Sequence, residues 1–168
     1  MSITTLCRKT PRQHNDHITT PQEEDIMSNQ VTAVPAAASL AAVAHFAAKA
    51  QFETDCSDVN AAFAAGEPGF VLLDVRNGSA YARGHVPGAL NLPHVEITVE
   101  RMAQWPLNTL FVVYCAGPHC NGADKGALKL AQLGRPVKLM IGGVTGWLDE
   151  GLPLHTGASQ MDAISCAC

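Results

Sequence analysis

Two cysteines separated by four residues follow an apolar run in the second half of the chain. Cys115 ends the run at residues 110–114, and Cys120 stands just before a stretch from Asn121 that is expected to be helical. Backbone N–H groups of the intervening loop and the positive end of the helix dipole would stabilise a thiolate at Cys115 and lower its pKa. The same loop would hold an anionic substrate. Three interpretations are open: a nucleophile, a redox or metal-binding pair, or buried, inert core residues.

Glycines mark the points where the backbone is expected to come close to this loop. Gly117 and Gly122 are predicted to adopt conformations that a β-carbon forbids. Gly142 and Gly143 follow a later apolar stretch and are predicted to let the backbone approach the loop. The predicted active-site loop consists of Ala116, Gly117, Pro118, His119, Cys120 and Asn121.

A zinc site is an alternative use of these thiols. Cys115, His119 and Cys120, together with Cys166 and Cys168 near the chain end, supply enough ligands. The first pair is spaced C-x₄-C, while the C-x-C spacing of the second pair is tighter than usual for zinc. We expect no metal and no other cofactor, because a tetrahedral site of three cysteines and one histidine would also bury the nucleophile.

The composition narrows the classes of function. The chain of 168 residues has a formal net charge of −4, a pI of about 5.9 and no basic run, which argues against nucleic-acid binding. The polar N-terminus lacks the apolar segment of a secretory signal, so we expect a cytoplasmic protein with reduced thiols. The Ala-rich stretch 36–50 is too short to cross a bilayer and contains His45 and Lys49, so we expect no membrane partner.

Alternating extended and helical patterns are expected to position the cysteines. Strands are predicted at residues 52–54, 70–75, 89–92, 110–114 and 137–141. Helices are predicted at 36–50, 55–66, 95–104, 121–133 and 144–150, the second of them capped by Asp55. This order predicts an α/β fold with an open five-stranded parallel sheet and helices on both faces. Cys115 would then end the most apolar strand, at the edge where such sheets bind ligands.

The sequence divides into four segments. They are a disordered N-terminal tail (1–34), an accessory helix (35–50), a folded domain (51–155) and a C-terminal tail (156–168). Met27 is a candidate start, and the sequence does not decide whether residues 1–26 are translated or which oligomeric state the protein has. Within the domain, His85 and Trp147 are expected to pack in the core rather than bind a ligand.

Three blocks of sequence, in this order, resemble the single-domain rhodaneses, a family of sulfurtransferases. They are VLLDVRNGSAYARGHVPGALNLPH (71–94), VVYCAGPHCNGADKGALKLAQLG (112–134) and VKLMIGGVTGWLDEGLPL (137–154). The resemblance implies a rhodanese-like domain that takes a sulfane sulfur from thiosulfate or a related donor onto a cysteine. The resulting persulfide passes its sulfur to a thiol or protein acceptor. The family's nucleophile ends the strand, and here that residue is Cys115.

The resemblance also implies roles for neighbouring residues. Asp74 would brace the loop and Arg76 would tie neighbouring segments together. Lys125 lies one turn into the helix, whereas members of the family usually place an Arg or Lys in the loop itself. The loop is about two residues longer than in ordinary members, which favours a roomier pocket. A phosphatase would need an arginine six positions after the cysteine, and that position is Asn121.

Two other functions are compatible with the sequence. A rhodanese-like binding or regulatory module would not need Cys115, and the presence of this cysteine at the strand end favours the enzyme. A thiol redox protein would use Cys120 to resolve Cys115 as a disulfide. The tail cysteines Cys166 and Cys168 lie about a dozen residues past His155, near enough to serve as an internal acceptor or resolving thiol.

Overall fold

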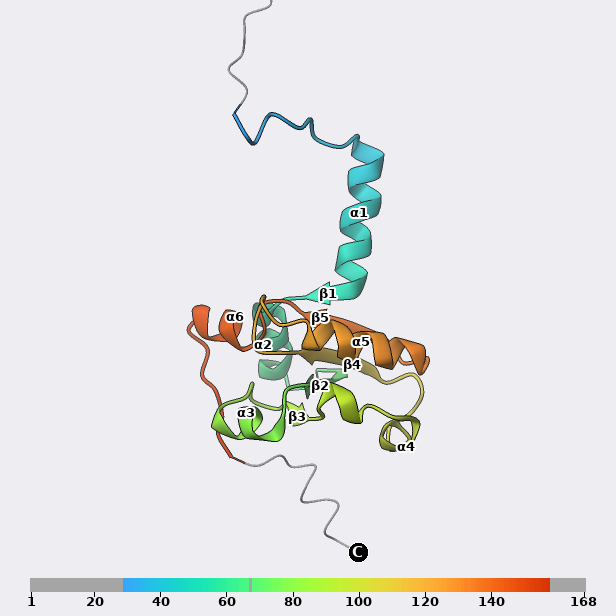
Figure 1. Ribbon diagram of the computed structural model, residues 1–168, viewed down its shortest axis with the longest axis vertical. Helices are drawn as coiled ribbons and strands as arrows, with labels where there is room; N and C mark the ends of the chain where they lie inside the picture. Colours follow the sequence, from blue (N-terminus) through green and yellow to red (C-terminus); the bar gives the residue numbers. More distant parts are fainter. Residues whose placement is uncertain (1–28, 67, 158–168) are drawn as a thin grey trace, which may run out of the picture. The chain divides into compact units, whose positions relative to one another are not determined.

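Five parallel strands form the centre of the computed structural model, which describes residues 29–66 and 68–157 (Figure 1). The strand order is β1-β5-β4-β2-β3, and every neighbouring pair is parallel. The strands are β1 (Glu53–Thr54), β2 (Phe70–Asp74), β3 (Leu90–Asn91), β4 (Leu110–Tyr114) and β5 (Val137–Met140). The predicted open five-stranded parallel sheet is confirmed.

Six α-helices and one 3₁₀ turn connect and cover the strands in the described part of the chain. They are α1 (Ser39–Phe52), α2 (Cys56–Ala64), α3 (Gly78–Arg83), η1 (His94–Glu96), α4 (Val99–Met102), α5 (Gly122–Gln132) and α6 (Gly143–Asp149). Asp55 caps α2 as predicted, because its side chain accepts a hydrogen bond of 2.8 Å from the N–H of Asp58.

Two of these elements correct the predictions. The prediction of a single helix at 95–104 is wrong. The chain forms η1, is extended at Ile97, and becomes helical again in α4. The side chain of Thr98 caps α4 by accepting a hydrogen bond from the N–H of Arg101. The buried side chain of Ile97 packs into the core, and this contact requires the break. Helix α3 was not predicted, although Asn77 caps it by accepting a 2.8 Å hydrogen bond from the N–H of Ala80.

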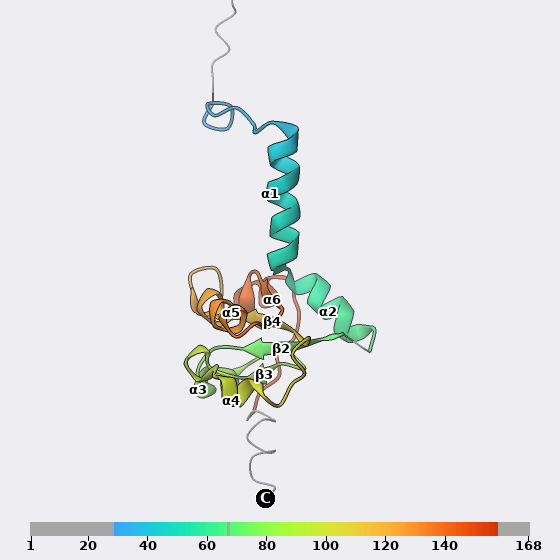
Figure 2. The same ribbon diagram turned by 90° about the vertical axis from the view of Figure 1, so that its right-hand side faces the viewer.

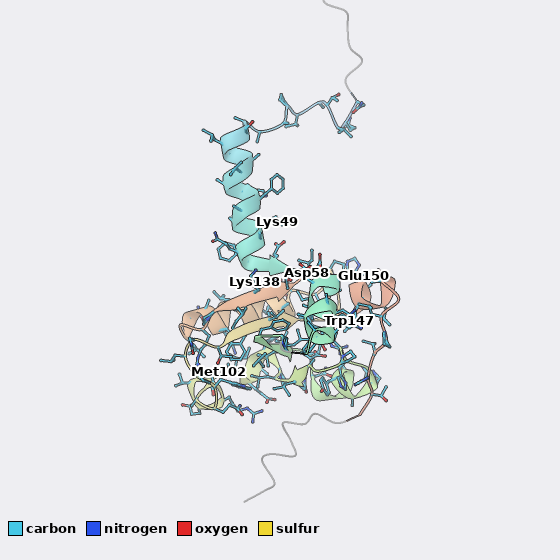
Figure 3. The ribbon with its side chains drawn as sticks, turned by 180° about the vertical axis from the view of Figure 1, so that it is seen from behind. Lys49, Asp58, Met102, Lys138, Trp147 and Glu150 are labelled. Carbon is cyan, nitrogen blue, oxygen red and sulfur yellow. A yellow bond between two sulfur atoms is a disulfide. The ribbon has the colours of Figure 1, made fainter. Side chains whose placement is uncertain are left out.

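The sheet separates two hydrophobic cores because side chains alternate along each strand. In β4, Val112 and Tyr114 point into one core and Phe111 and Val113 into the other, where Cys115 joins them. Figure 1 shows α5 in front of the sheet, and Figure 3, from behind, shows α2 in front of it. Each fully buried aliphatic side chain in these cores stabilises the fold by about 1.5–3 kcal/mol.

The register of β2 and β4 brings the ends of both strands to one edge of the sheet. The pair runs from Phe70 opposite Leu110 to Asp74 opposite Tyr114. The N–H of Val75 then donates to the carbonyl of Tyr114 over 3.1 Å, so the segment after β2 begins beside Cys115. Figure 2, turned by 90°, shows β2 and β4 as neighbours in the sheet. The pairing places the loops that follow the two strands together.

Helix α1 has no buried residue. At its end, Lys49 pairs with Glu53 over 3.1 Å, and the Nζ of Lys138 on β5 donates to the carbonyl of Ala50 over 2.8 Å. Within the described residues, no helix is both long and apolar enough to cross a membrane. The predictions for the two tails fall largely on residues 1–28 and 158–168, which lie outside the described residues, as do Cys166 and Cys168.

Candidate active site

The backbone around Cys115 is held by the first turn of α6. The carbonyl of Cys115 accepts a hydrogen bond from the N–H of Val144 (3.1 Å). The carbonyl of Ala116 accepts two, from the N–H (2.9 Å) and the Oγ1 (3.0 Å) of Thr145. Strand β4 fixes the other side of Cys115, whose side chain is only 6% exposed. The position of the sulfur is therefore set by two elements that are distant in sequence.

Gly143 makes this close approach possible, as predicted. Its φ is +57°, and a β-carbon there would overlap the carbonyl oxygen of Cys115 and lie 3.0 Å from the N atom of Gly117. The prediction for Gly117 and Gly122 needs correction, because neither has a positive φ. These two glycines provide space: a β-carbon on Gly117 would lie 2.6 Å from Thr145 Oγ1, and one on Gly122 would lie 2.8 Å from Cys115 Sγ.

Cys115 and Cys120 form a disulfide, with their Cα atoms 6.3 Å apart. The N–H of Cys120 donates to the carbonyl of Gly117 over 3.0 Å, so the loop folds back on itself between the two cysteines. The N–H of Gly122, the first residue of α5, donates to Cys120 Sγ over 3.4 Å. Both sulfur atoms therefore lie at the N-terminus of an eleven-residue helix, where N–H groups and the helix dipole favour a thiolate.

Two cavities open on the sulfur pair, and Cys115 and Cys120 line both of them. The larger is about 480 Å³, and its wall is mostly apolar. Its other lining residues are Val75, Arg76, Asn77, Ala80, Pro93, His94, Val95, Ala116, Asn121 and Gly122. The smaller is about 220 Å³ and lies against Gly117, Pro118, Asp124 and Gly143, among others. A third cavity, of about 470 Å³ around His85 and His155, contains none of the loop residues.

The predicted loop residues divide between these surfaces. Ala116 and Asn121 line the larger cavity, and Gly117 and Pro118 line the smaller one. His119 and Lys125 are exposed and line neither cavity. Sequence analysis missed His94, which stands three residues after the end of β3 and lines the larger cavity. Within the residues that the structure describes, no group of three or more His, Cys, Asp or Glu side chains is arranged to hold a metal ion.

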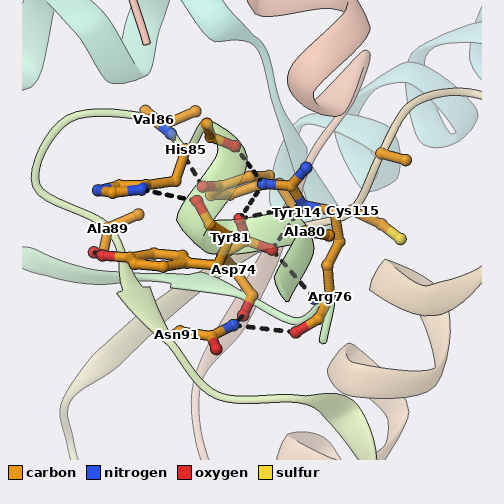
Figure 4. A network of polar contacts seen from close by, with 12 residues as sticks. Asp74, Arg76, Ala80, Tyr81, His85, Val86, Ala89, Asn91, Tyr114 and Cys115 are labelled. Carbon is orange, nitrogen blue, oxygen red and sulfur yellow. Dashed lines mark hydrogen bonds and ion pairs between the residues drawn. The ribbon is translucent and has the colours of Figure 1, made fainter. Parts of the chain in front are cut away.

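A largely buried ion pair between Arg76 and Asp74 lies beside the larger cavity, which Arg76 lines, and Figure 4 shows its polar contacts. Arg76 Nε donates to both carboxylate oxygens of Asp74, at 2.9 and 3.1 Å, and Nη2 donates to Asp74 and to the carbonyl of Gly84. Burial opposes the charge of Arg76, but the hydrogen bonds and Coulomb attraction of Asp74 raise its pKa overall. Asp74 is fully buried, so it depends on this partner.

Tyr114 extends this network. Its hydroxyl accepts a hydrogen bond of 3.0 Å from the N–H of Val86, and the guanidinium of Arg76 lies 6.0 Å from its ring centroid. Burial and the charge of Asp74 raise the pKa of Tyr114, so it stays protonated. Since Tyr114 immediately precedes Cys115, the network fixes the end of β4 from the face opposite to the sulfur.

His85 and Trp147 are core residues, as predicted. His85 Nδ1 lies 3.0 Å from the carbonyl of Tyr81, and the two rings stack with centroids 3.7 Å apart. Trp147 is 1% exposed, and its Nε1 donates to the carbonyl of Pro153 over 2.9 Å. The backbone of His85 also pairs with that of His155, and the N–H of Gly157 donates to the carbonyl of Ala82 over 3.0 Å.

Cys56 is a free, buried thiol on the opposite face of the sheet from the loop. Burial, and then the charges of Glu150 and Asp55, raise its pKa from 9.0 to about 11. Its sulfur lies 3.5 Å from the carbonyl oxygen of Ile141 and 3.6 Å from that of Gly143. Burial therefore favours a neutral thiol at Cys56, although this residue is the first of α2.

The raised pKa of Cys56 predicts that the stability of the fold depends on pH. As pH rises, Cys56 ionises in the unfolded chain before it does so in the folded chain. The neutral thiol therefore makes its full contribution to the free energy of unfolding below pH 9.0, and this contribution is lost as pH rises toward about 11. From about pH 8 to about pH 10.5, the free energy of unfolding should fall by about 2 kcal/mol more in the reduced wild type than in Cys56→Ala. Denaturant titrations of both proteins measure this difference in slope. Parallel pH profiles would contradict the prediction.

The fold and this loop define the class of protein: a parallel α/β domain with a cysteine at the carboxyl end of its central strand. The family model described as Rhodanese-like domain matches residues 55–150. The chain belongs to this family.

The chain is also similar to individual proteins and solved structures. A "Sulfurtransferase" of Allochromatium vinosum is 32% identical over 50% of this chain and 77% of its own length. The "HTH-type transcriptional regulator Rv0324" of Mycobacterium tuberculosis is 37% identical over 52% of this chain, and the match spans only 38% of the regulator. The crystal structure of the BH2092 protein from Bacillus halodurans is 34% identical, with a TM-score of 0.68, over 72% of this chain and 88% of that one.

Proposed function

We propose that this protein is a sulfurtransferase that carries a sulfane sulfur on Cys115 as a persulfide. The observation that carries the proposal is the placement of Cys115. It ends β4, and its sulfur lies at the N-terminus of α5 and faces the cavity of about 480 Å³. The A. vinosum relative named as a sulfurtransferase supports the same reaction class.

The reduced site would act in two half-reactions. The Cys115 thiolate attacks the outer sulfur of thiosulfate or a related donor, and a sulfur–sulfur bond forms to Sγ. The donor's own bond to that sulfur breaks, which releases sulfite from thiosulfate or a thiolate from an organic persulfide. Backbone N–H groups of the loop and α5 stabilise the persulfide anion. A thiolate or other thiophilic acceptor then attacks the outer sulfur, and the Cys115 thiolate is regenerated.

The cavity favours a particular kind of donor or acceptor. Its wall is mostly apolar, and the guanidinium of Arg76 is already bonded to Asp74 and Gly84. His119 and Lys125 line neither cavity, so the charge of an anionic donor would rest mainly on backbone N–H groups. A persulfide or thiol carried on an organic group fits this wall better than a small, strongly hydrated anion, and competition between the two kinds of donor would measure the preference.

A second candidate is a binding or regulatory module. The M. tuberculosis relative is named as a transcriptional regulator and is much longer than the match, so its matching part is one portion of a larger protein. If this chain is a binding or regulatory module, Cys115 should not take up sulfur. The same experiment therefore tests both functions.

The test is the intact mass of the reduced full-length protein after exposure to thiosulfate. Under our proposal, Cys120→Ser gains the mass of one sulfur atom and releases sulfite, while the double variant Cys115→Ser/Cys120→Ser gains nothing. The Cys120→Ser background removes the neighbouring thiol that would otherwise react with the product. If Cys120→Ser takes up no sulfur from thiosulfate or from an organic persulfide, the binding module is the better interpretation.

A further inference from the structure

The disulfide between Cys115 and Cys120 shows that the loop brings both sulfurs within bonding contact. A Cα separation of 6.3 Å lies within the range that disulfides span without backbone distortion. The carbonyls of Cys115 and Ala116 keep their hydrogen bonds to Val144 and Thr145 in this state. The contact therefore forms with the start of the loop still anchored to α6.

We infer that Cys120 is a second catalytic residue, which attacks the Cys115 persulfide and releases its sulfur as hydrosulfide. The inference rests on the proposed function, because it requires that persulfide. The Cys120 thiolate forms a bond to Cys115 Sγ, and the bond between Sγ and the sulfane sulfur breaks. The persulfide is protonated on its outer sulfur when it is attacked, so the sulfane sulfur takes the electron pair, keeps this proton and leaves as HS⁻. It is thereby reduced, while the two cysteines are oxidised to a disulfide.

The geometry directs this attack to the inner sulfur of the persulfide. Cys120 Sγ lies in bonding contact with Cys115 Sγ, whereas the sulfane sulfur would project beyond it. Attack on the outer sulfur would move the persulfide from one cysteine to the other without releasing a product. The arrangement therefore favours hydrosulfide release.

The N-terminus of α5 activates the attacking thiol. The N–H of Gly122 donates to Cys120 Sγ over 3.4 Å, so the helix end stabilises the thiolate of Cys120. Gly122 also leaves the space in which the sulfurs meet, because a β-carbon there would lie 2.8 Å from Cys115 Sγ and 3.3 Å from Cys120 Sγ. Gly122 therefore both donates a hydrogen bond to Cys120 and leaves the space in which the two sulfur atoms meet.

The resulting disulfide stays open to a reductant. Cys120 is half-buried, and both cysteines line both cavities. An external dithiol attacks the disulfide, forms its own disulfide and restores both cysteines as thiols. Each cycle therefore consumes one dithiol and yields one hydrosulfide and one sulfite from thiosulfate, so a dithiol-regenerating reaction must supply this enzyme with reductant.

A single turnover without added thiol tests the inference. Reduced, desalted, full-length wild type, Cys120→Ser and Cys56→Ser are mixed anaerobically with thiosulfate, and sulfite, hydrosulfide and intact mass are followed. We expect all three to release sulfite. Wild type and Cys56→Ser should also release near-stoichiometric hydrosulfide and end as the Cys115–Cys120 disulfide, whereas Cys120→Ser should keep its persulfide and release at least tenfold less. Added dithiothreitol should give multiple turnovers of hydrosulfide release in wild type.

The remaining outcomes separate this inference from the proposed function. Sulfite release with a persulfide equally long-lived in wild type and Cys120→Ser overturns the role of Cys120 alone. A disulfide from Cys115 to Cys166 or Cys168, found by peptide mapping, would also overturn the role of Cys120. It would assign the resolving role to a cysteine of the tail. If none of the proteins takes up sulfur from thiosulfate or from an organic persulfide, the proposed function fails and the inference fails with it.

Discussion

Cys115→Ser is expected to lower sulfur transfer from thiosulfate to a thiol acceptor by at least about three orders of magnitude. A serine hydroxyl at this site remains neutral near pH 7 and cannot carry a persulfide, so the covalent route is lost entirely. The change is nearly isosteric, and the main-chain bonds from Cys115 and Ala116 to Val144 and Thr145 do not involve the sulfur. Steady-state kinetics measures the loss, and thermal unfolding of the reduced proteins should show a Tm within a few degrees of wild type.

Cys56→Ser is the matched control for this experiment. It replaces a buried thiol in the other core, and a serine hydroxyl can still donate to the carbonyls of Ile141 and Gly143, so the rate of transfer should stay within about threefold of wild type. If Cys115→Ser retains activity and Cys120→Ser does not, the nucleophile is Cys120 and our assignment is wrong.

Gly143→Ala is expected to destabilise the fold by about 3 kcal/mol or more. The added β-carbon would overlap the carbonyl oxygen of Cys115 at a residue whose φ is +57°, and backbone on both sides would have to move. Because the displaced atoms belong to the proposed nucleophile, we also expect transfer to slow by about a hundredfold at temperatures where the variant is folded. Denaturant unfolding and single-turnover kinetics measure the two effects.

Gly151→Ala separates strain from overlap. Gly151 follows the other end of α6 and has a φ of +74°, but a β-carbon there would have no atom within 4 Å. Gly151→Ala should lower the free energy of unfolding by only about 1–2 kcal/mol, because an alanine must adopt the left-handed backbone conformation there. The variant should transfer sulfur at the wild-type rate. Equal effects of the two substitutions would show that the contact between Gly143 and Cys115 has little energetic weight.

The centre of the sheet was predictable because β2 and β4 are continuous apolar runs that are largely buried. The run at residues 110–114 became β4 with the predicted bounds, and the cysteine after it ends the central strand. Asp55 marked the start of α2 correctly, and α5 ends within one residue of the predicted boundary at 133. These features depend on local residue types and on burial patterns that are visible in a short window of sequence.

What escaped prediction depends on contacts between distant segments. Helix α3 is short and begins with Gly78 and Ser79, which are weak helix formers, so only the Asn77 cap indicated it. The break at Ile97 follows from its place in the core. His94 reached the site because β3 pairs with β2, and the need for glycine at 122 became visible only with two sulfurs beside it. None of these contacts leaves a periodic pattern in the sequence.

The anchoring of Cys115 by α6 has a consequence for synthesis on the ribosome. Val144 and Thr145 close the site from 29 residues further along the chain, and β5 must pair with β4 before they can do so. A nascent chain that has exposed Cys115 but not yet α6 therefore carries this thiol without its main-chain anchors. Because domains fold as units once their chain has emerged, the special reactivity of the cysteine would be acquired only after α6 has left the ribosome.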